Sequence, residues 1–343
     1  MQVLVTGGAG FIGSNFVHYA LEAHPDWEIV NLDKLTYAGN PANIADLRDH
    51  PRHRFVRGDI CDPEVVEQCM REVDIVINFA AESHIDRSIA DPSDFIMTDM
   101  YGAYVLLEAA RKFGPARFLQ ISTVEVYGEA GEVPPDEEGP LRPKSPYAAS
   151  KAGGDRLCYS YFTTYGTPVV IVRCVNNYGP YQYPEKVIPL FVTNAIDNEP
   201  LPLYGSGNNT REWVAVLDHC RALDLLAAAE GIEGEVFNIG SGVELSVWDL
   251  ARRILQHLGK PPSLARLVED RPGHVRRIAL NWSKIRKRLG WEPQIDIEAG
   301  LSAAIEWYRQ HQEWWRPIKS GAYKRFYQQQ YAERLRSREE GHD

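Results

Sequence analysis

A tyrosine and a lysine in the middle of the chain could together carry acid–base chemistry. Tyr147 and Lys151 stand four positions apart in a segment with a helical pattern, so both lie on one helix face about a turn apart. Free tyrosine has a pKa of about 10, and a phenolate that acts as a base near pH 7 needs roughly 4 kcal/mol of stabilisation. A cation within about 4–6 Å moves a neighbouring pKa by about 1–3 units. We therefore predict that Lys151 lowers the pKa of Tyr147.

More reactive groups stand upstream of this pair, where the apolar strand predicted at 118–121 ends. Ser122 and Thr123 offer hydroxyls there, and Glu125 offers a carboxylate. The spacing of Tyr147 and Lys151 also occurs on ordinary surface helices, so it points to catalysis only together with the N-terminal segment.

The N-terminal segment has the pattern of a dinucleotide site. A short apolar strand at 2–6 runs into glycines at positions 7, 10 and 13, then into a helix and a second strand at 28–33 that ends in Asp33. Such glycines allow a tight turn and a close approach of backbone N–H groups to a pyrophosphate at the helix N-terminus. A carboxylate at the position of Asp33 binds ribose hydroxyls and repels a 2′-phosphate, which predicts NAD rather than NADP.

Alternating strands and helices continue after this unit. The pattern predicts strands at 55–60, 74–78, 118–121 and 169–172, and helices at 63–71, 92–113 and 147–165. Repeated βαβ units indicate an α/β protein with a doubly wound parallel sheet, whose ligands bind beyond the carboxyl ends of the strands. All the reactive residues named above lie at such ends.

The chain changes character after Arg173, where Pro, Gly and Tyr become frequent. We predict a dinucleotide-binding domain at 1–178, a smaller discontinuous lobe at 179–330, and a charged tail at 331–343 that frays. Segments within about 211–243 are predicted to return to the first domain, with strands at 213–218 and 236–239 that rejoin its sheet. Further helices are predicted at 245–258, 283–289 and 297–312.

Composition excludes several classes of protein. The 343 residues carry a net charge of −10, which argues against non-specific binding of nucleic acid. No apolar run approaches the roughly 20 residues that cross a bilayer, so no membrane partner is expected. The five cysteines are odd in number and scattered, with no CxxC pair, which indicates reduced thiols. The first residues show no basic segment followed by a cleavable apolar core, so a cytoplasmic location is expected. No metal site is predicted.

With these motifs in hand, the chain resembles the dTDP-glucose 4,6-dehydratase family, which consists of extended short-chain dehydrogenases/reductases that modify nucleotide sugars. The resemblance extends to about residue 317. Beyond the glycine loop and the Tyr147–Lys151 pair, it rests on the runs 35–40, 79–88, 176–181, 184–189 and 270–274.

The resemblance implies an NAD-dependent lyase with a Rossmann domain and specific roles for its residues. Tyr147 would take the proton of the sugar 4-hydroxyl, Lys151 would hold the nicotinamide ribose, Thr123 would bind the 4-oxygen, and Glu125 would remove the C5 proton. The residues expected to bind NAD are Gly7, Gly10, Phe11, Ile12, Gly13, Asp33, Lys34, Asp59, Ile60, Ala80, Ala81, Tyr147 and Lys151. Those expected to bind a dTDP- or UDP-hexose are Ser83, Asn176, Lys186, Pro202, Tyr204, Arg211, Asn238, Arg271 and His274. The family commonly forms homodimers through two helices per subunit, and the helices that begin near Pro92 and Tyr147 are the candidates.

Two positions depart from the pattern of the family. The family has an aspartate at position 124 that protonates the departing 6-hydroxyl, and this chain has Val124, which offers no proton. Acid assistance is worth about 10²–10⁴-fold. Either another group compensates, or C4 oxidation leads to a different outcome: 4-epimerisation, or decarboxylation as in UDP-glucuronate decarboxylases. A protein that only binds NAD or a nucleotide sugar is a further alternative, opposed by the intact Thr123, Glu125, Tyr147 and Lys151. Asp99 stands where the family usually has asparagine.

Overall fold

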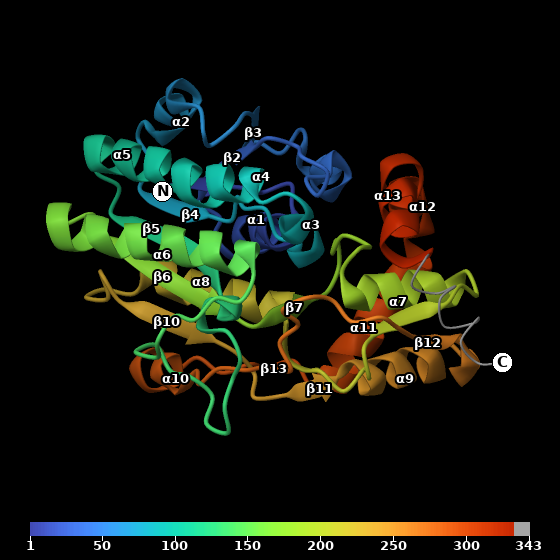
Figure 1. Cartoon of the computed structure of the whole chain (residues 1–343). Helices are drawn as coiled ribbons and strands as arrows, with labels where there is room; N and C mark the ends of the chain where they lie inside the picture. Colours follow the sequence, from blue (N-terminus) through green and yellow to red (C-terminus); the bar gives the residue numbers. More distant parts are fainter. Residues whose placement is uncertain (333–343) are drawn as a thin grey trace.

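A seven-stranded parallel sheet forms the framework of the computed structural model, which describes residues 1–332. Its strand order is β10-β6-β5-β4-β1-β2-β3 (Figure 1). The strands are β1 (Gln2–Thr6), β2 (Glu28–Asp33), β3 (His53–Arg57), β4 (Ile75–Asn78), β5 (Arg117–Thr123), β6 (Val169–Cys174) and β10 (Val236–Ile239). The order reverses between β1 and β4, where open parallel sheets bind their ligands. The predicted fold class is confirmed.

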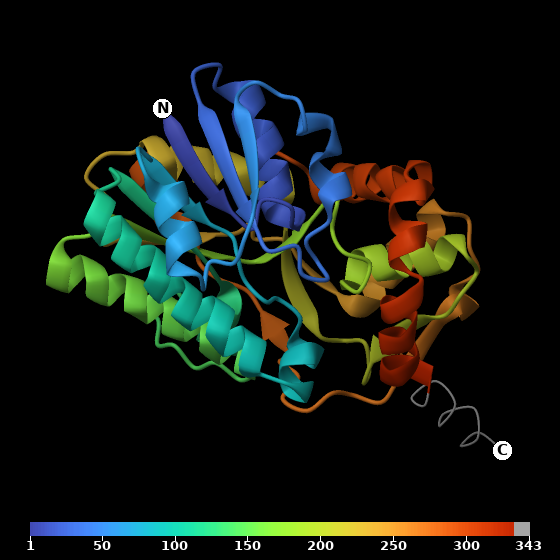
Figure 2. The same ribbon diagram turned by 90° about the horizontal axis from the view of Figure 1, so that it is seen from above.

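Helices cover both faces of this sheet. One face packs on α1 (Phe11–Ala23) and α8 (Val216–Ala228), and the other on α2 (Pro63–Met70), α5 (Ala103–Phe113) and α6 (Pro146–Tyr165). The central strands are buried on both sides, which explains the continuous apolar run 169–172 of β6. Figure 2 shows α5 and α6 side by side at the edge of the molecule that lies opposite the C-terminal helices.

The second part of the structure is a smaller lobe with its own apolar core. A four-stranded sheet joins β7 (Asn176–Tyr178), β9 (Thr210–Ala215), β11 (Glu244–Ser246) and β13 (Arg277–Ile278), and β8 (Leu201–Tyr204) pairs with β12 (Ala265–Val268). The packed helices are α7 (Val187–Ile196), α9 (Val247–His257), α11 (Ile297–Gln310), α12 (Gln312–Ile318) and α13 (Gly321–Tyr327). The prediction that 213–218 rejoins the large sheet is wrong, because β9 belongs to the lobe and residue 216 begins α8; only β10 returns. The division into domains stays a prediction.

The helix predicted at 92–113 is interrupted by a wider turn. It consists of α4 (Ser93–Ile96), a π-helical turn η2 (Met97–Gly102) and α5. A π turn inserts one residue into an α-helix and often marks a functional site. A further helix, α3 (Ile85–Ala90), begins within the segment 79–88 and had not been predicted.

The remaining elements are short. They are the 3₁₀ turns η1 (Pro41–Leu47), η3 (Val124–Tyr127) and η4 (Pro262–Leu264), the helix α10 (Ser283–Leu289) and the π turn η5 (Gln328–Ala332). The strand predicted at 55–60 lies earlier, at β3, so that Asp59 and Ile60 fall in the loop that follows it.

The C-terminal segment differs from its prediction at its first residue. Tyr331, placed in the fraying tail, is 6% exposed and packs in the core of the lobe. Residues 333–343 of the predicted tail lie outside the described residues. Within residues 1–332, no helix has the length and apolar character needed to cross a bilayer.

Candidate active site

A single pocket of about 430 Å³ lies at the carboxyl ends of the parallel strands and reaches the lobe. It is lined by every residue predicted to bind NAD, by all four predicted catalytic residues, and by all predicted substrate-binding residues except Asn238. The fold therefore brings together segments from the N-terminal loop to the C-terminal lobe. Pockets of this size are typical of ligand sites.

The glycine loop leaves space and free donors for a pyrophosphate. A Cβ atom at Gly7, whose φ is +70°, would lie 2.7 Å from the backbone nitrogen of Ala80, and one at Gly13 would lie 2.3 Å from the carbonyl oxygen of Gly7. No side chain caps the N-terminus of α1, and its first turn has no acidic residue. Its N–H groups thus remain available to an anion, and these residues have the geometry needed to hold a dinucleotide.

The carboxylate of Asp33 is held in place beside this loop. It accepts hydrogen bonds from the backbone N–H groups of Ala9 (2.9 Å) and Leu35 (2.7 Å). Burial raises the pKa of Asp33, and the two N–H groups oppose that effect. At the neighbouring strand end, Lys34 forms an ion pair of 2.7 Å with Asp59. Two fixed carboxylates thus stand where the adenosine end of NAD is predicted to bind.

Around the turn η3, side chains alternate between the pocket and the apolar core. Thr123 caps the turn by accepting a hydrogen bond from the Glu125 N–H (3.2 Å), and both residues line the pocket. Val124 and Val126 alternate with them and are 1% and 0% exposed in the apolar core. The turn therefore presents a hydroxyl and a carboxylate to the pocket and buries the intervening valines.

The electrostatics of Tyr147 differ from the prediction. Burial raises its pKa, and the nearby carboxylates of Asp99 and Glu125 raise it further, while a hydrogen bond with Thr123 lowers it. Lys151 lies on the same helix face but donates its hydrogen bond to the Ile121 carbonyl (2.7 Å). Without ligands, burial and two nearby carboxylates therefore hold the pKa of Tyr147 above its usual value, and the lowering by Lys151 stays a prediction for the site with NAD bound.

Asp99 contributes a second buried charge beside the catalytic helix. Its Oδ2 accepts a hydrogen bond from Ser150 Oγ (2.6 Å), and its Oδ1 has no hydrogen-bond partner among the described residues. Burial raises the pKa of Asp99 to about 6, and Lys151 opposes this effect. The close approach depends on Gly154, because a Cβ atom there would lie 2.4 Å from the Asp99 carbonyl oxygen. The π turn and this glycine together place Asp99 against α6, where its charge acts on Tyr147.

Replacing Asp99 with asparagine is expected to stabilise the protein at alkaline pH. A carboxyl group whose pKa is raised in the folded state does not lower the free energy of unfolding at pH values below its unfolded pKa of about 4, because it is protonated in both states. Above that pH its ionisation favours the unfolded state, and this effect grows until the pH exceeds the folded pKa. The free energy of unfolding of Asp99→Asn should thus equal that of wild type near pH 4 and exceed it by about 3 kcal/mol at pH 8. Denaturant titrations at both pH values check this, with the exposed Asp94→Asn as the control. A loss of stability at pH 8 would contradict it.

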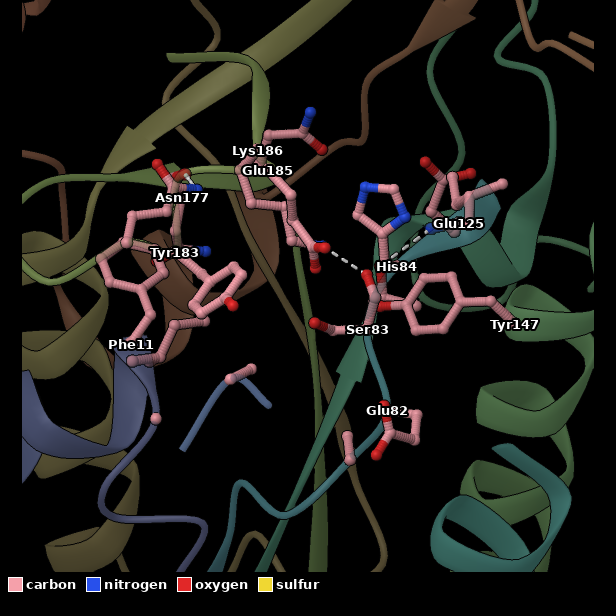
Figure 3. A pocket seen from close by; sticks show the side chains of 18 of the residues that line it. Phe11, Glu82, Ser83, His84, Glu125, Tyr147, Asn177, Tyr183, Glu185 and Lys186 are labelled. Carbon is pink, nitrogen blue, oxygen red and sulfur yellow. Dashed lines mark hydrogen bonds between the residues drawn. The ribbon is translucent and has the colours of Figure 1, made fainter. Parts of the chain in front are cut away.

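Cations gather where the diphosphate is predicted to bind. Burial lowers the pKa of Lys186, and it lowers that of Arg211 to about 10; Arg271 lowers both pKa values further. Lys186 donates a hydrogen bond to the carbonyl oxygen of Ser83 across the pocket from Glu125 and Tyr147 (Figure 3). Three cations held close together in a buried site favour an anionic ligand.

Several lining residues had not been predicted. Asp86 forms an ion pair of 3.2 Å with Arg271 and accepts a hydrogen bond from Tyr204 (3.2 Å). The other lining residues that sequence reasoning missed include Glu82, His84, Thr98, Gln182, Tyr183, Glu185 and Tyr331. Glu82, His84 and Asp86 lie in the run 79–88, which the resemblance already singled out and which could therefore have indicated them. No sequence pattern indicated Tyr331, because its segment looks like a charged tail.

His274 lines the pocket as predicted, whereas Asn238 does not. His274 donates a 2.6 Å hydrogen bond from Nδ1 to the Asp270 carboxylate, and has a pKa lowered to about 4 by burial and Arg271. Asn238 is fully buried beneath the pocket. Its amide accepts from the Tyr127 hydroxyl (2.8 Å) and donates to the Asn281 carbonyl (3.0 Å). The prediction that it contacts the substrate is therefore corrected, because its polar atoms are occupied within the protein.

Replacing Val124 with aspartate is expected to destabilise the protein without accelerating product formation. The side chain of Val124 packs in the apolar core rather than lining the pocket. A carboxyl group there would be buried without a partner, at a cost of about 3 kcal/mol. Thermal unfolding and product formation of Val124→Asp check this, with the similarly shaped but uncharged Val124→Thr as the control. A stable Val124→Asp variant that forms product faster would show that the side chain reaches the substrate.

Comparison with known proteins now assigns the chain to a family. A family model described as GDP-mannose 4,6 dehydratase matches residues 4–304. The dTDP-glucose 4,6-dehydratase of Streptomyces niveus is 48% identical over 324 residues, which cover 93% of this chain and 96% of that relative. The chain belongs to the dTDP-glucose 4,6-dehydratase family.

Solved structures of this family have the same fold. DesIV, a dTDP-glucose 4,6-dehydratase from Streptomyces venezuelae solved with NAD bound, matches with a TM-score of 0.91 and 50% identity over 93% of this chain and 100% of DesIV. A UDP-glucuronic acid 4-epimerase from Bacillus cereus matches with a TM-score of 0.86 but only 28% identity, over 91% of this chain and 100% of the epimerase. The dehydratases are therefore much closer to this chain than this epimerase.

Proposed function

We propose that the protein is an NAD-dependent lyase that converts dTDP-glucose to dTDP-4-keto-6-deoxyglucose. The observation that carries this proposal is the convergence of Thr123, Glu125, Tyr147 and Lys151 with the glycine loop and the cation cluster in one pocket. The identity of about 50% to dehydratases favours this reaction over epimerisation.

Each catalytic side chain has a proposed task. Tyr147 removes the proton of the 4-hydroxyl, and Thr123 holds the oxygen that becomes the C4 carbonyl. The C5 proton becomes acidic beside that carbonyl, and Glu125 removes it. NAD, when bound by the glycine loop and Asp33, would supply the hydride chemistry between C4 and C6, and its positive charge would favour the phenolate of Tyr147. Lys151, 5% exposed, adds a second positive charge near the nicotinamide ribose.

Loss of the 6-hydroxyl requires a proton that position 124 does not supply. Val124 faces the core, whereas Glu125 lines the pocket and holds the proton taken from C5. We propose that Glu125 passes this proton to the departing hydroxyl, which leaves as water. C5 then takes a proton from solvent as hydride returns to C6, and Tyr147 releases the 4-hydroxyl proton to solvent, so that atoms and charges balance. One carboxyl group thus performs both proton transfers of the elimination, and the chain compensates for the absent aspartate.

The test is to incubate the purified protein and NAD with dTDP-glucose in deuterated water and to identify the product by NMR. The proposal expects a 4-keto-6-deoxy sugar with deuterium at C5. Recovery of the C4 epimer without deuterium would establish the epimerase instead. Conversion of UDP-hexoses but not dTDP-glucose would change the proposed substrate. If none of these sugars reduced NAD, the protein would be one that binds NAD or a nucleotide sugar without catalysing a reaction.

A homodimer is also proposed, formed through α5, α6 and the turns before α5. Large apolar side chains are exposed on this surface, which we call the α5–α6 face: Ile96 (51%), Met97 (48%), Tyr101 (40%), Tyr104 (42%) and Tyr159 (43%). Several exposed large apolar side chains on neighbouring helices favour an interface there, and a second copy of the chain is the occupant that the family suggests.

A double substitution on the α5–α6 face is expected to separate the subunits. Ile96→Glu with Tyr104→Glu places four charges in a dimer interface that excludes water, so the protein should sediment as a monomer at micromolar concentration. Leu217→Glu is the matched control, since Leu217 is 39% exposed on α8 at the other face of the sheet. Unchanged sedimentation of the double variant, or a monomeric wild type, would contradict the proposal.

A cytoplasmic location is proposed from the cysteines. All five are free thiols, and four of them are buried. Unpaired thiols persist in reducing compartments.

A further inference from the structure

A buried network of charged and polar side chains lies behind the catalytic residues. Its centre is an ion pair between Arg173 of β6 and Asp155 of α6, which are 2% and 0% exposed. The guanidinium donates to both carboxylate oxygens, at 2.8 Å from Nε and 3.1 Å from Nη2. Ser122 at the end of β5 donates to the same carboxylate at 3.2 Å. The network thus joins the strand that leads to Thr123 with the helix that carries Tyr147 and Lys151.

The hydroxyl of Tyr127 extends this network to the turn η3. It accepts a hydrogen bond from Arg173 Nη1 (2.8 Å) and donates one to Asn238 Oδ1 (2.8 Å). The guanidinium also lies 4.9 Å from the centre of the Tyr127 ring. Burial raises the pKa of Tyr127 to about 12, so the hydroxyl keeps the proton that it donates. Both hydrogen-bonding capacities of this hydroxyl are therefore used inside the protein.

Tyr127 is connected to Glu125 through the backbone of one short turn. Both belong to the four-residue turn η3, and the Gly128 N–H donates to the Glu125 carbonyl (3.1 Å) to close it. Tyr147 and Lys151 are held separately, by α6 and by the Ile121 carbonyl. A shift of η3 would therefore displace Glu125 more than it displaces Tyr147.

From this geometry we infer that Tyr127 is a positioning residue for the proton transfer at C5. Its hydroxyl fixes η3 between Arg173 and Asn238, and thereby fixes the carboxylate of Glu125 relative to a sugar that Tyr147 has already engaged. The inference rests on the proposed function. Because misplacement by about 1 Å can cost about 10²-fold in rate, loss of this one hydroxyl should slow the step that Glu125 performs and spare the preceding hydride transfer.

The experiment compares the two steps in Tyr127→Phe, which removes only the hydroxyl. The rate at which reduced nicotinamide appears after mixing with dTDP-glucose reports C4 oxidation, and deuterium uptake at C5 in deuterated water reports the action of Glu125. We expect the first rate to stay within about 3-fold of wild type and the second to fall by at least about 10-fold, with reduced nicotinamide accumulating. Tyr161→Phe is the matched control, because Tyr161 is a buried tyrosine of α6 whose hydroxyl donates to Glu108 outside this network.

Each outcome decides the inference. The inference would be overturned if Tyr127→Phe lost both rates equally or lost neither. It would also be overturned if Tyr161→Phe slowed deuterium uptake while sparing C4 oxidation. If Tyr127→Phe does not fold, Asn238→Leu removes the acceptor of the same hydroxyl. This variant should also slow deuterium uptake at C5 and spare C4 oxidation. A rise in KM with both rates intact would instead show that Asn238 contacts the substrate, and would overturn the inference. Failure of the proposed function is distinguishable, since wild type itself would then give no 4-keto-6-deoxy product with deuterium at C5.

Discussion

Replacing Tyr147 with phenylalanine is expected to lower the rate of C4 oxidation by about 10³-fold, because loss of a general base costs about 10²–10⁴-fold. The phenol oxygen is the group that takes the hydroxyl proton, and phenylalanine keeps the ring contact with Phe95, whose ring centre lies 6.3 Å away. The variant should fold and bind substrate normally. The measurement is the appearance of reduced nicotinamide after rapid mixing with dTDP-glucose.

A tyrosine on the same helix provides the control for this variant. Tyr165 is 56% exposed at the end of α6, far along the helix from Tyr147, and Tyr165→Phe should retain the wild-type rate. Nicotinamide reduction by Tyr147→Phe at more than about a tenth of the wild-type rate would show that another group removes the proton, and the role of Tyr147 would have to be abandoned.

Replacing Glu125 with glutamine is expected to stop the reaction after C4 oxidation. Glutamine has the same size but cannot take the C5 proton or deliver it to the leaving hydroxyl. Product formation should fall by about 10³-fold or more, since two proton transfers depend on this carboxylate. Reduced nicotinamide should still appear and then persist, and the sugar should gain no deuterium at C5.

The exposed Glu138 of the neighbouring acidic loop gives the matched control, and Glu138→Gln should behave as wild type. If Glu125→Gln still forms the 4-keto-6-deoxy product with deuterium at C5, a different residue or a water molecule performs the elimination. Loss of nicotinamide reduction as well would place Glu125 in the first step rather than the second.

The dinucleotide half of the site could be predicted because its signals are local. The glycines at 7, 10 and 13 and the acid at 33 lie within one βαβ unit, where spacing along the chain fixes spacing in the fold. The structure places all of these residues in the pocket. Their binding roles stay predictions, and the NAD-bound relative supports them.

Other features depended on contacts between distant segments. The direction of Val124 is set by the turn η3 against the core, and the burial of Asn238 by contacts with Tyr127 and Asn281, which no pattern along the chain reveals. The pKa of Tyr147 could not be derived from Lys151 alone, because Asp99 approaches from a π turn that the helical pattern of 92–113 conceals.

The wall of the pocket that carries Tyr331 has a consequence for how the protein is made. All seven strands of the parallel sheet and the glycine loop are encoded by residues 2–239, whereas Tyr331 and its neighbour Gln330, which donates a 2.7 Å hydrogen bond to Tyr204, come much later. On the ribosome, the dinucleotide half is thus complete well before the site for the sugar nucleotide is closed. A nascent chain should acquire affinity for the cofactor first, and only the finished polypeptide should hold the sugar nucleotide.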